Sequence, residues 1–413
     1  MHSAVLESFE KKDFLNFVRA VSGIWETDAL FSGAGYTGEN VSVCYILPIS
    51  SYAVTGRESV SGLRRFINSD DKETYGFLAY DLGLSLKDVH TDKKLMTDPG
   101  LFKKYAAYAR HCGQRLTIES DCPVILEKAL IAYETYSPTP PNMSAADVKC
   151  NMTRQDYVGK VKEVIEYIRD GHTYQLNLSM MFEAETYEKP YDIWAHTAEM
   201  NPAPFYALFK FNEGHILSTS PERFIKVSDR KVLSQPIKGT LRFKEYYPEL
   251  EQKLTESVKE SAELSMIVDL IRNDISETCE VGSVEVLEHK SVMCVDDLLQ
   301  MYSSVCGTLK DGKDVLDLLF SAFPGGSVTG CPKKRSMELI DSLEPHSRGV
   351  YCGSIVRVLD MDNMDSSVAI RTGVLKNNTF SFYAGSGIVA DSVPENEYEE
   401  SVSKADKFLR LFR

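Results

Sequence analysis

Four glutamates form two pairs whose spacing suits a cation site. Glu260 and Glu263 are three residues apart, as are Glu397 and Glu400, so each pair lies on one face if the segment is helical. The helix after Glu263 is apolar nearly all round, which predicts burial, and a buried carboxylate needs a partner. Mg²⁺ suits such a site because it takes one or two carboxylates and keeps other positions open. Solvated helix faces with ordinary ion pairs are the alternative interpretation.

Lys238 and Glu222 could supply a nucleophile and an acid. Lys238 stands between Pro236-Ile237 and Gly239-Thr240, which places it on irregular backbone rather than on a free helix face. Partial burial there would favour the nucleophilic amine, and Glu222 could be the matching acid. Isolated lysines usually face solvent, so the spacing alone assigns neither role.

Residues near the C-terminus form a candidate carboxylate receptor. Arg371 lies in an expected strand, where alternation places it on the face opposite its apolar neighbours. Gly385-Ser386-Gly387 ends the paired strand, and glycines there let backbone N–H groups approach an anion. An arginine fork with free amides binds a carboxylate. Lys404 follows Glu400 by four residues, which by itself predicts only an exposed ion pair.

The segment from Gly325 to Lys333 superficially resembles a phosphate loop but fails the test. A phosphate loop requires lysine directly after its second glycine, whereas Cys331 and Pro332 follow Gly330. The chain also lacks a G-x-S-x-G elbow and an H-E-x-x-H zinc helix. Nucleotide binding and hydrolase chemistry are therefore disfavoured.

The composition is that of a globular protein, with 43% hydrophobic and 26% charged residues. A net charge of −14 disfavours nucleic-acid and membrane-surface partners, so an anionic ligand needs a local cationic site. Nine cysteines without a C-x-x-C pair, and a start without a signal-peptide run, predict a cytoplasmic protein.

Periodicity predicts the elements that carry these residues. We expect an amphipathic helix over 157–168, which residues 151–154 lead into and Gly171 closes. We also expect strands over 174–180, 205–211 and 223–227, and one long helix over about 248–274 that carries Glu260 and Glu263. Residues 368–375 and 379–383 predict a hairpin. A final helix follows, with Ser392 and Glu395 as its capping box.

Ordered motifs from Asn151 to Arg413 resemble the chorismate-utilising enzymes. This family includes anthranilate synthase component I, aminodeoxychorismate synthase component I, and the isochorismate and salicylate synthases. The motifs are Thr173–Ser179, Ser220–Phe224, Pro236–Thr240, Val268–Asp274, Phe323–Lys333, Ile370–Thr372, Gly385–Ser392 and Glu397–Glu400. The N-terminal part matches faintly, at Gly76–Gly83.

The resemblance implies an α+β fold, in which two antiparallel β-sheets pack together with helices on the outside, as in anthranilate synthase component I. The site would lie in the cleft between the sheets. Residues 1–145 would form an N-terminal subdomain and residues 146–413 the chorismate-binding catalytic domain, together in one compact body.

The resemblance also implies roles for the candidate residues. Lys238 would attack C2 of chorismate while Glu222 protonates the departing C4 hydroxyl, and ammonia from a glutamine amidotransferase subunit would then attack C4. Mg²⁺ would bind Glu263 and Glu400, with Glu260 and Glu397 as outer partners. Implied substrate contacts are Gly239, Thr240, Tyr351, Arg371, Gly385, Ser386, Gly387 and Lys404.

Three positions bear on the kind of reaction. Gln175 replaces the water-activating lysine of isochorismate and salicylate synthases, and an amide cannot act as that base. The Pro-Ile-Lys-Gly-Thr motif around Lys238 resembles that of the aminodeoxychorismate synthases of folate biosynthesis, whereas anthranilate synthases usually carry alanine in place of this lysine. Gln300 stands where close relatives carry histidine, so a hydrogen-bonding role survives and a proton-transfer role does not. Anthranilate synthase component I and a non-catalytic chorismate-binding protein are the alternatives.

The family also has a tryptophan pocket. The residues that match it are Ser32, Pro204, Phe205 and Tyr206. Because these residues could equally be core, we favour core packing over feedback control.

Overall fold

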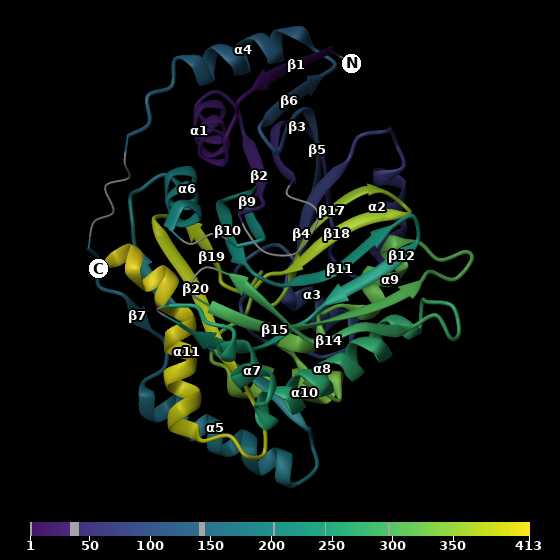
Figure 1. Cartoon of the computed structure of the whole chain (residues 1–413), viewed down its shortest axis with the longest axis vertical. Helices are drawn as coiled ribbons and strands as arrows, with labels where there is room; N and C mark the ends of the chain where they lie inside the picture. Colours follow the sequence, from purple (N-terminus) through teal and green to yellow (C-terminus); the bar gives the residue numbers. More distant parts are fainter. Residues whose placement is uncertain (1, 34–40, 140–144, 201–202, 244, 296–297) are drawn as a thin grey trace.

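The computed structural model describes residues 2–33, 41–139, 145–200, 203–243, 245–295 and 298–413. Within these ranges all pairs of strands are antiparallel, and the hydrogen-bonded network joins 20 strands. Figure 1 shows the strands in the middle of the molecule and helices around them.

The first sheet carries the strand that ends in the glycine motif. Its strands, in order across the sheet, are β8 (Gln175–Glu185), β20 (Thr379–Ile388), β19 (Thr372–Lys376), β10 (Gly214–Ser220), β9 (Phe205–Phe211), β2 (Thr27–Phe31) and β3 (Val41–Ala53). The short strands β7 (Lys149–Cys150) and β16 (Gly330–Cys331) pair with the other edge of β8.

The second sheet carries Lys238. Its strands run in the order β4 (Thr74–Leu78), β17 (Ser354–Asp360), β18 (Asn363–Val368), β11 (Arg223–Ser228), β12 (Lys231–Gln235) and β15 (Leu298–Thr308), with β13 (Ile237–Arg242) and β14 (Glu285–Val295) also on β15. Long β5 (Gly100–Cys112) pairs with β3 and β4 and so joins the two sheets; beyond it lie β6 (Arg115–Ser120) and β1 (His2–Glu7).

The two sheets pack face to face through aromatic and aliphatic side chains. Phe209 of the first sheet lies 5.3 Å from Phe77 and 5.5 Å from Tyr75 of the second, between ring centroids. Ile216 and Ile355 belong to the same buried cluster. Burial of these large rings is a major stabilising contribution to the fold. The two packed antiparallel sheets confirm the predicted α+β fold.

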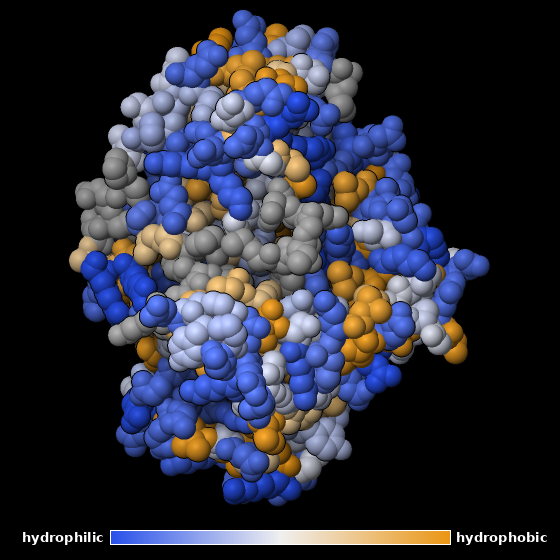
Figure 2. Space-filling model, in the orientation of Figure 1, coloured by the Kyte–Doolittle hydropathy of each residue, from blue (hydrophilic) through white to orange (hydrophobic). Residues whose placement is uncertain are grey.

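Helices cover the outer faces. They are α1 (Lys11–Ser22), α2 (Val60–Ile67), α3 (Tyr80–Leu86), α4 (Pro123–Glu134), α5 (Arg154–Arg169), α6 (Pro190–Met200), α7 (Glu249–Thr255), α8 (Val258–Ser276), α9 (Val315–Ala322), α10 (Lys333–Leu343) and α11 (Pro394–Leu409), with 3₁₀ turns η1 (Arg57–Ser59), η2 (Gly326–Val328) and η3 (Arg410–Phe412). Helix α11 packs on α5 and β20, and α8 packs on β13 and β15. The face seen in Figure 2 is largely hydrophilic, with scattered hydrophobic residues. Within the described ranges, no helix combines the length and apolar character needed to cross a membrane.

Three local predictions are wrong for identifiable reasons. The expected helix over 248–274 is two helices, because the Ser257 hydroxyl accepts a hydrogen bond from the Glu260 amide and begins α8 anew. Ser392 does not cap α11 in a box with Glu395; its hydroxyl donates to Glu397, and Pro394 begins the helix. Arg371 has φ +48° and lies between β18 and β19, so strand alternation does not orient it.

Other local predictions are confirmed. Helix α5 and strand β9 match the expected ranges closely, and β19 and β20 form the expected hairpin. Strands from before residue 145 pair with later ones, β2 with β9 and β4 with β17. The division between residues 145 and 146 stays a prediction.

Candidate active site

A cavity of about 410 Å³ lies among β13, β20, α8 and α11. This volume is in the usual range of ligand sites, roughly 300–1,000 Å³. Predicted site residues that line it are Glu222, Lys238, Gly239, Glu260, Glu263, Tyr351, Arg371, Gly385, Gly387, Glu400 and Lys404. The fold therefore gathers side chains from positions 222 to 404 into one hollow.

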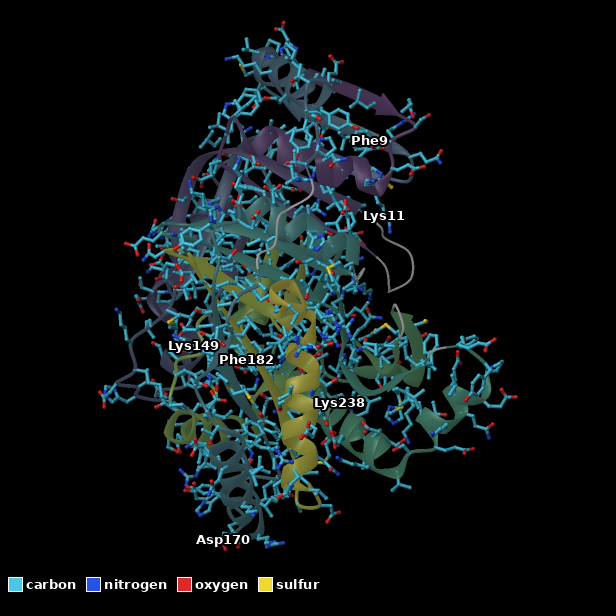
Figure 3. All side chains as sticks on the ribbon, turned by 90° about the vertical axis from the view of Figure 1, so that its left-hand side faces the viewer. Phe9, Lys11, Lys149, Asp170, Phe182 and Lys238 are labelled. Atoms are coloured by element: carbon cyan, nitrogen blue, oxygen red, sulfur yellow. The ribbon has the colours of Figure 1, made fainter. Side chains whose placement is uncertain are left out.

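Lys238 reaches into this cavity from β13. Its side chain is 14% exposed, and its Nζ lies 3.8 Å from Oε2 of Glu263. In Figure 3 Lys238 lies beside the yellow helix α11, in the middle of the molecule. The neighbouring Gly239 has φ +75°, a conformation that glycine adopts without strain, and the pairing of β13 with β15 shifts register there. The irregular backbone expected around Lys238 is thus present.

Gly387 provides the space that the Lys238 amine occupies. A Cβ atom at Gly387 would lie 3.0 Å from Lys238 Nζ and 3.0 Å from Gln175 Nε2. The lysine amine and the glutamine amide therefore lie over the same glycine. Asn177, opposite Gly387 in the β8–β20 pairing, also lines the cavity.

Glu222 is a buried acid in the same cavity. Its Oε1 accepts a hydrogen bond of 2.7 Å from the Ser327 hydroxyl. Burial raises the pKa of Glu222 to about 7, and the Ser327 hydrogen bond and the charges of Lys238, Lys404 and Arg371 oppose that rise. A carboxyl with this pKa is substantially protonated near neutral pH, so it can act as a general acid.

The segment that resembles a phosphate loop positions Ser327. Lys333 Nζ donates to Oδ2 of Asp274 at 2.8 Å and to the carbonyl oxygen of Ala322 at 2.7 Å. Both side chains of this ion pair are about 10% exposed. The lysine is therefore engaged inside the protein, where it anchors the end of the segment whose turn η2 carries Ser327.

The two glutamate pairs approach each other from α8 and α11, and three of their four members line the cavity. Two lysines besides Lys238 lie beside these glutamates. Lys259 Nζ is 3.9 Å from Glu263 and 3.6 Å from Glu397, and Lys404 Nζ is 2.7 Å from Glu400. Lys404 chiefly lowers the pKa of Glu400.

Glu260 lies near carboxylates of both helices as well as near Lys259 and Lys238. Burial raises the pKa of Glu260, and the charges of Glu263 and Glu400 raise it further. A bound cation would relieve that repulsion.

The acidic residues fit a magnesium ion. The described residues contain no cluster of three or more His, Cys, Asp or Glu side chains already arranged around a metal position. Mg²⁺, however, needs only one or two carboxylates, with water and substrate oxygens as further ligands. Glu263 and Glu400 line the cavity and could serve. Glu397 does not line it; its side chain is 2% exposed and accepts a 2.7 Å hydrogen bond from Ser392, a geometry suited to an outer partner.

The expected anion-binding residues are gathered only in part. Arg371 and Lys404 line the cavity, and Lys404 Nζ also donates to the carbonyl oxygen of Gly385 at 3.2 Å. Ser386 does not line it, because its hydroxyl is buried against that of Tyr157, 3.1 Å away. The Thr240 side chain lies outside the described residues.

Tyr351 lies in the cavity wall. Its ring stacks on that of Tyr383, with centroids 5.1 Å apart.

The cavity wall includes residues that sequence reasoning missed. These are Asn177, Lys259, Ser327, Tyr383, Lys407 and Arg410, among others. A lysine directly before Glu260, and an asparagine within the Thr173–Ser179 motif, are the signals that could have found two of them. Gln300 also lines the cavity, is 2% exposed, and its Oε1 has no hydrogen-bond partner among the described residues.

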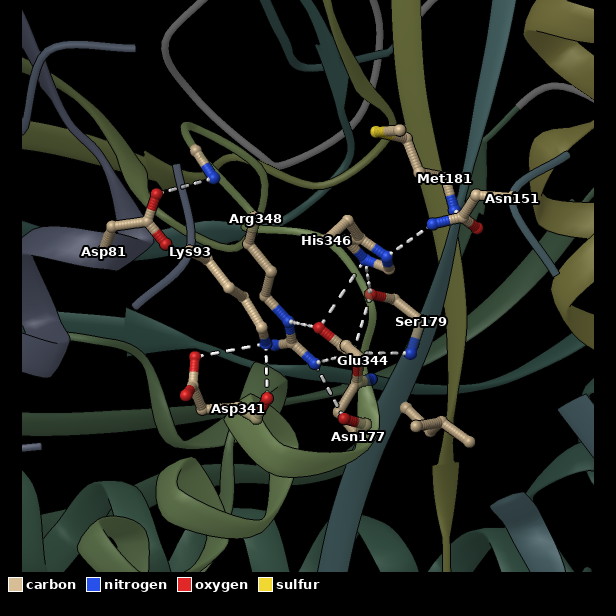
Figure 4. Close-up of polar contacts among 12 residues, drawn as sticks. Asp81, Lys93, Asn151, Asn177, Ser179, Met181, Asp341, Glu344, His346 and Arg348 are labelled. Carbon is tan, nitrogen blue, oxygen red and sulfur yellow. Dashed lines mark hydrogen bonds and ion pairs between the residues drawn. The ribbon is translucent and has the colours of Figure 1, made fainter. Parts of the chain in front are cut away.

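A buried ionic network holds the strand behind the cavity in place. Arg348 donates to Glu344 at 2.7 Å and to the carbonyl oxygens of Asn177 and Val328, and Glu344 in turn accepts from the Ser179 amide and hydroxyl (Figure 4). These contacts link β8 to η2 through charge-assisted hydrogen bonds. The two elements that present Asn177 and Ser327 are thereby fixed relative to each other.

The residues that match a tryptophan pocket lie apart from the main cavity. Ser32, Pro204 and Phe205 line a separate cavity of about 80 Å³, well below the usual size of ligand sites. Tyr206 does not line it; its hydroxyl donates to the Thr197 carbonyl oxygen at 3.0 Å. Pro204, Phe205 and Tyr206 are buried, as core packing requires.

The large cavity combines a buried acid, an enclosed amine and several carboxylates, a combination typical of enzyme active sites. Comparison with known sequences identifies the protein family. The chain belongs to the family of chorismate binding enzymes, whose sequence profile matches residues 50–410.

Relatives carry two functional names. Aminodeoxychorismate synthase component 1 of Escherichia coli is 37% identical over 342 residues, 81% of this chain and 76% of that protein. The protein of that name from Salmonella typhimurium is 41% identical over 63% of this chain and 58% of its own length. Anthranilate synthase component 1 of Aquifex aeolicus is 37% identical over 63% of this chain and 54% of its own length.

Solved structures show the same fold. Anthranilate synthase component I from Streptococcus pneumoniae superposes with a TM-score of 0.76 at 26% identity, covering 99% of this chain and 92% of that one. The isochorismate synthase MenF from Escherichia coli has a TM-score of 0.76 at 18% identity, covering 100% of this chain and 94% of that one. The predicted family resemblance is confirmed.

Proposed function

We propose that this chain is an aminodeoxychorismate synthase component that converts chorismate and ammonia to 4-amino-4-deoxychorismate, a step of folate biosynthesis. The observation that carries the proposal is the enclosed Lys238 amine, which shares one cavity with the buried acid Glu222. Relatives named aminodeoxychorismate synthase component 1 support the same choice.

In the proposed first step the Lys238 amine forms a bond to C2 of the chorismate ring. Electron pairs shift along the ring diene, the C4–O bond breaks, and the Glu222 proton leaves with the hydroxyl as water. In the second step ammonia forms a bond to C4, the diene shifts back, and the C2–N bond to lysine breaks. The covalent step divides one difficult displacement into two easier ones. The enolpyruvyl group remains on the product.

Charge complementarity supports a dianionic substrate. Arg371 and Lys404 bring positive charge to the cavity, where a carboxylate of the substrate would bind. When bound to Glu263 and Glu400, Mg²⁺ would neutralise the acidic side and act as a Lewis acid toward a substrate carboxylate. Glu260 and Glu397 would act as outer partners that accept hydrogen bonds from water molecules on the ion.

A separate glutamine amidotransferase subunit is proposed as the source of ammonia. The relatives are named as first components, which supports a partner component. A cytoplasmic location is part of the same proposal, and the nine cysteines, all unpaired, suit that reducing compartment.

The product distinguishes this function from its alternatives. The chain is to be incubated with chorismate, Mg²⁺ and an ammonium salt, and the products separated by liquid chromatography with mass detection. We expect 4-amino-4-deoxychorismate without release of pyruvate. Fluorescent anthranilate with pyruvate would instead establish an anthranilate synthase, an alternative favoured by relatives of that name at 37% identity. Chorismate binding without turnover would favour a non-catalytic binding protein.

Gly387→Ala should impair chemistry while the fold survives. The added methyl would lie 3.0 Å from the ends of two flexible side chains, Lys238 and Gln175, so these move and the backbone does not. A nucleophile displaced by about 1 Å can cost roughly 10²-fold in rate. Steady-state kinetics and the melting temperature measure the two effects. Gly159→Ala is the matched control, because a Cβ there meets no atom within 4 Å. Equal activity of both variants would contradict the placement of Lys238.

Ser327→Ala should shift the pH profile. The Ser327 hydroxyl stabilises the ionised form of Glu222, so its loss raises the pKa of Glu222 further. Because the protonated acid is the active form, the rate of the variant should fall at a higher pH than that of the wild type. The measurement is kcat against pH, with Ser342→Ala on α10 as the control. A profile that shifts to lower pH would contradict this role.

A further inference from the structure

Lys259 occupies a position that helix electrostatics disfavour. It lies in the first turn of α8, directly after Val258 and two residues after the N-cap Ser257. The positive end of the helix dipole repels a cation there. Interaction with the helix dipole therefore does not favour a lysine at this position, and its other contacts are of interest.

The acidic side of the cavity is what the Lys259 ammonium faces. Its Nζ lies 3.6 Å from Glu397 and 3.9 Å from Glu263. Glu260 and Glu400, the other members of the two pairs, line the same cavity as Lys259. One ammonium group thus lies between a glutamate of α8 and a glutamate of α11.

Lys259 is more exposed than Lys238 and, within the described part of the chain, its amine is not held by a backbone contact as that of Lys404 is. Its side chain is 50% exposed, whereas that of Lys238 is 14% exposed. Lys404 is held by Glu400 and by the carbonyl oxygen of Gly385. A lysine on a flexible four-carbon stem, with half its surface in water, can withdraw its charge without disturbing the cavity.

We propose that Lys259 is an exchangeable counter-cation of the acidic cluster. Its ammonium neutralises Glu263 and Glu397 when no metal ion is bound, and it withdraws toward solvent when Mg²⁺ binds, so it sets the affinity for the metal. This inference rests on the proposed magnesium site at Glu263 and Glu400. It assigns a function in metal exchange to a residue that need not touch the substrate.

Lys259→Met tests the proposal, because methionine keeps the apolar stem and removes the charge. Mn²⁺ serves as the probe, and the electron paramagnetic resonance signal of the free ion measures its binding to the whole chain. Removing one cation near the ion should tighten binding by about tenfold, given the partial solvent screening at this site. Lys253→Met on α7 is the control, since it removes the same charge from an exposed position, and it should leave the affinity unchanged.

Further measurements separate the possible failures. Mg²⁺ should raise the melting temperature of Lys259→Met more than that of the wild type, because tighter binding stabilises the folded state more. Glu263→Gln should weaken Mn²⁺ binding in both backgrounds. Binding by the wild type with no tightening in Lys259→Met would overturn the role of Lys259 alone. Failure of the wild type to bind Mn²⁺, or binding unaffected by Glu263→Gln, would overturn the magnesium site and this inference with it.

Discussion

Lys238→Ala is expected to lower ammonia-dependent turnover of chorismate by roughly 10³-fold or more, because the variant loses its nucleophile while the rest of the site remains. The Lys238 side chain lines the cavity, with its amine 3.8 Å from Glu263 and over Gly387, so its truncation enlarges the cavity and opens no void in the hydrophobic core. The melting temperature should therefore change little. Steady-state assays with chorismate, Mg²⁺ and ammonium salt measure the loss.

A covalent intermediate can also be observed directly. When chorismate is supplied without ammonia, the wild-type chain should gain the mass of chorismate less one water, and Lys238→Ala should gain nothing. Lys253→Ala is the matched control, because it removes an exposed lysine outside the cavity, and it should behave as wild type. Normal turnover by Lys238→Ala would rule out the covalent mechanism. Turnover lost together with the fold, seen as a collapsed melting transition, would contradict the purely chemical role.

The spacing of apolar residues along the sequence predicted many of the helices and strands, because contacts between residues close in sequence determine where these elements form. Helix α5 begins at an N-cap Thr153 and carries its apolar residues at helical spacing, so its bounds follow from the sequence. Arg371 shows the limit, since it has φ +48° between β18 and β19, where its carbonyl oxygen accepts hydrogen bonds from the amide and hydroxyl of distant Thr219. Ser392 shows a second limit. Its hydroxyl donates to Glu397, five residues later at the start of α11, so the sequence offered two local partners and the capping box is not the one used.

The candidate site depended on the family motifs more than on spacing. The two glutamate pairs carried a local signal, because a spacing of three residues places both members on one helix face. That α8 and α11 then face each other is a tertiary fact. Glu222 and Lys238 are sixteen residues apart, Glu222 just before β11 and Lys238 on β13, and they line one cavity only because the fold brings these two segments together. Lys259 carried only the weak signal of its place directly before Glu260, so its contacts with Glu263 and Glu397 had to be seen in the structure.

Glu222→Gln is expected to reduce kcat by about 10²–10⁴-fold, the usual contribution of a general acid. Glutamine keeps the shape of the side chain and can still accept the hydrogen bond from Ser327, but it has no proton to give to the C4 hydroxyl. Wild-type activity should fall as the pH rises through about 7, where Glu222 ionises, and the residual activity of the variant should lack that fall. Glu256→Gln, an exposed position on the same protein, is the control. A variant that retains full activity would rule out the acid role.

Glu222→Gln should be less active than the wild type but, near neutral pH and above, more stable to heating. Burial raises the pKa of Glu222 from its ordinary value of 4.5 to about 7, so the carboxyl favours folding below pH 4.5 and this contribution is lost as the pH rises through 7. Glutamine is neutral at every pH, so the variant does not lose stability through ionisation at this position. The melting temperature of Glu222→Gln relative to wild type should therefore increase between pH 5 and pH 8, measured by differential scanning calorimetry. A relative melting temperature that stays constant over this range would show that Glu222 does not ionise inside the protein near neutral pH, and the acid would have to be sought elsewhere in the cavity.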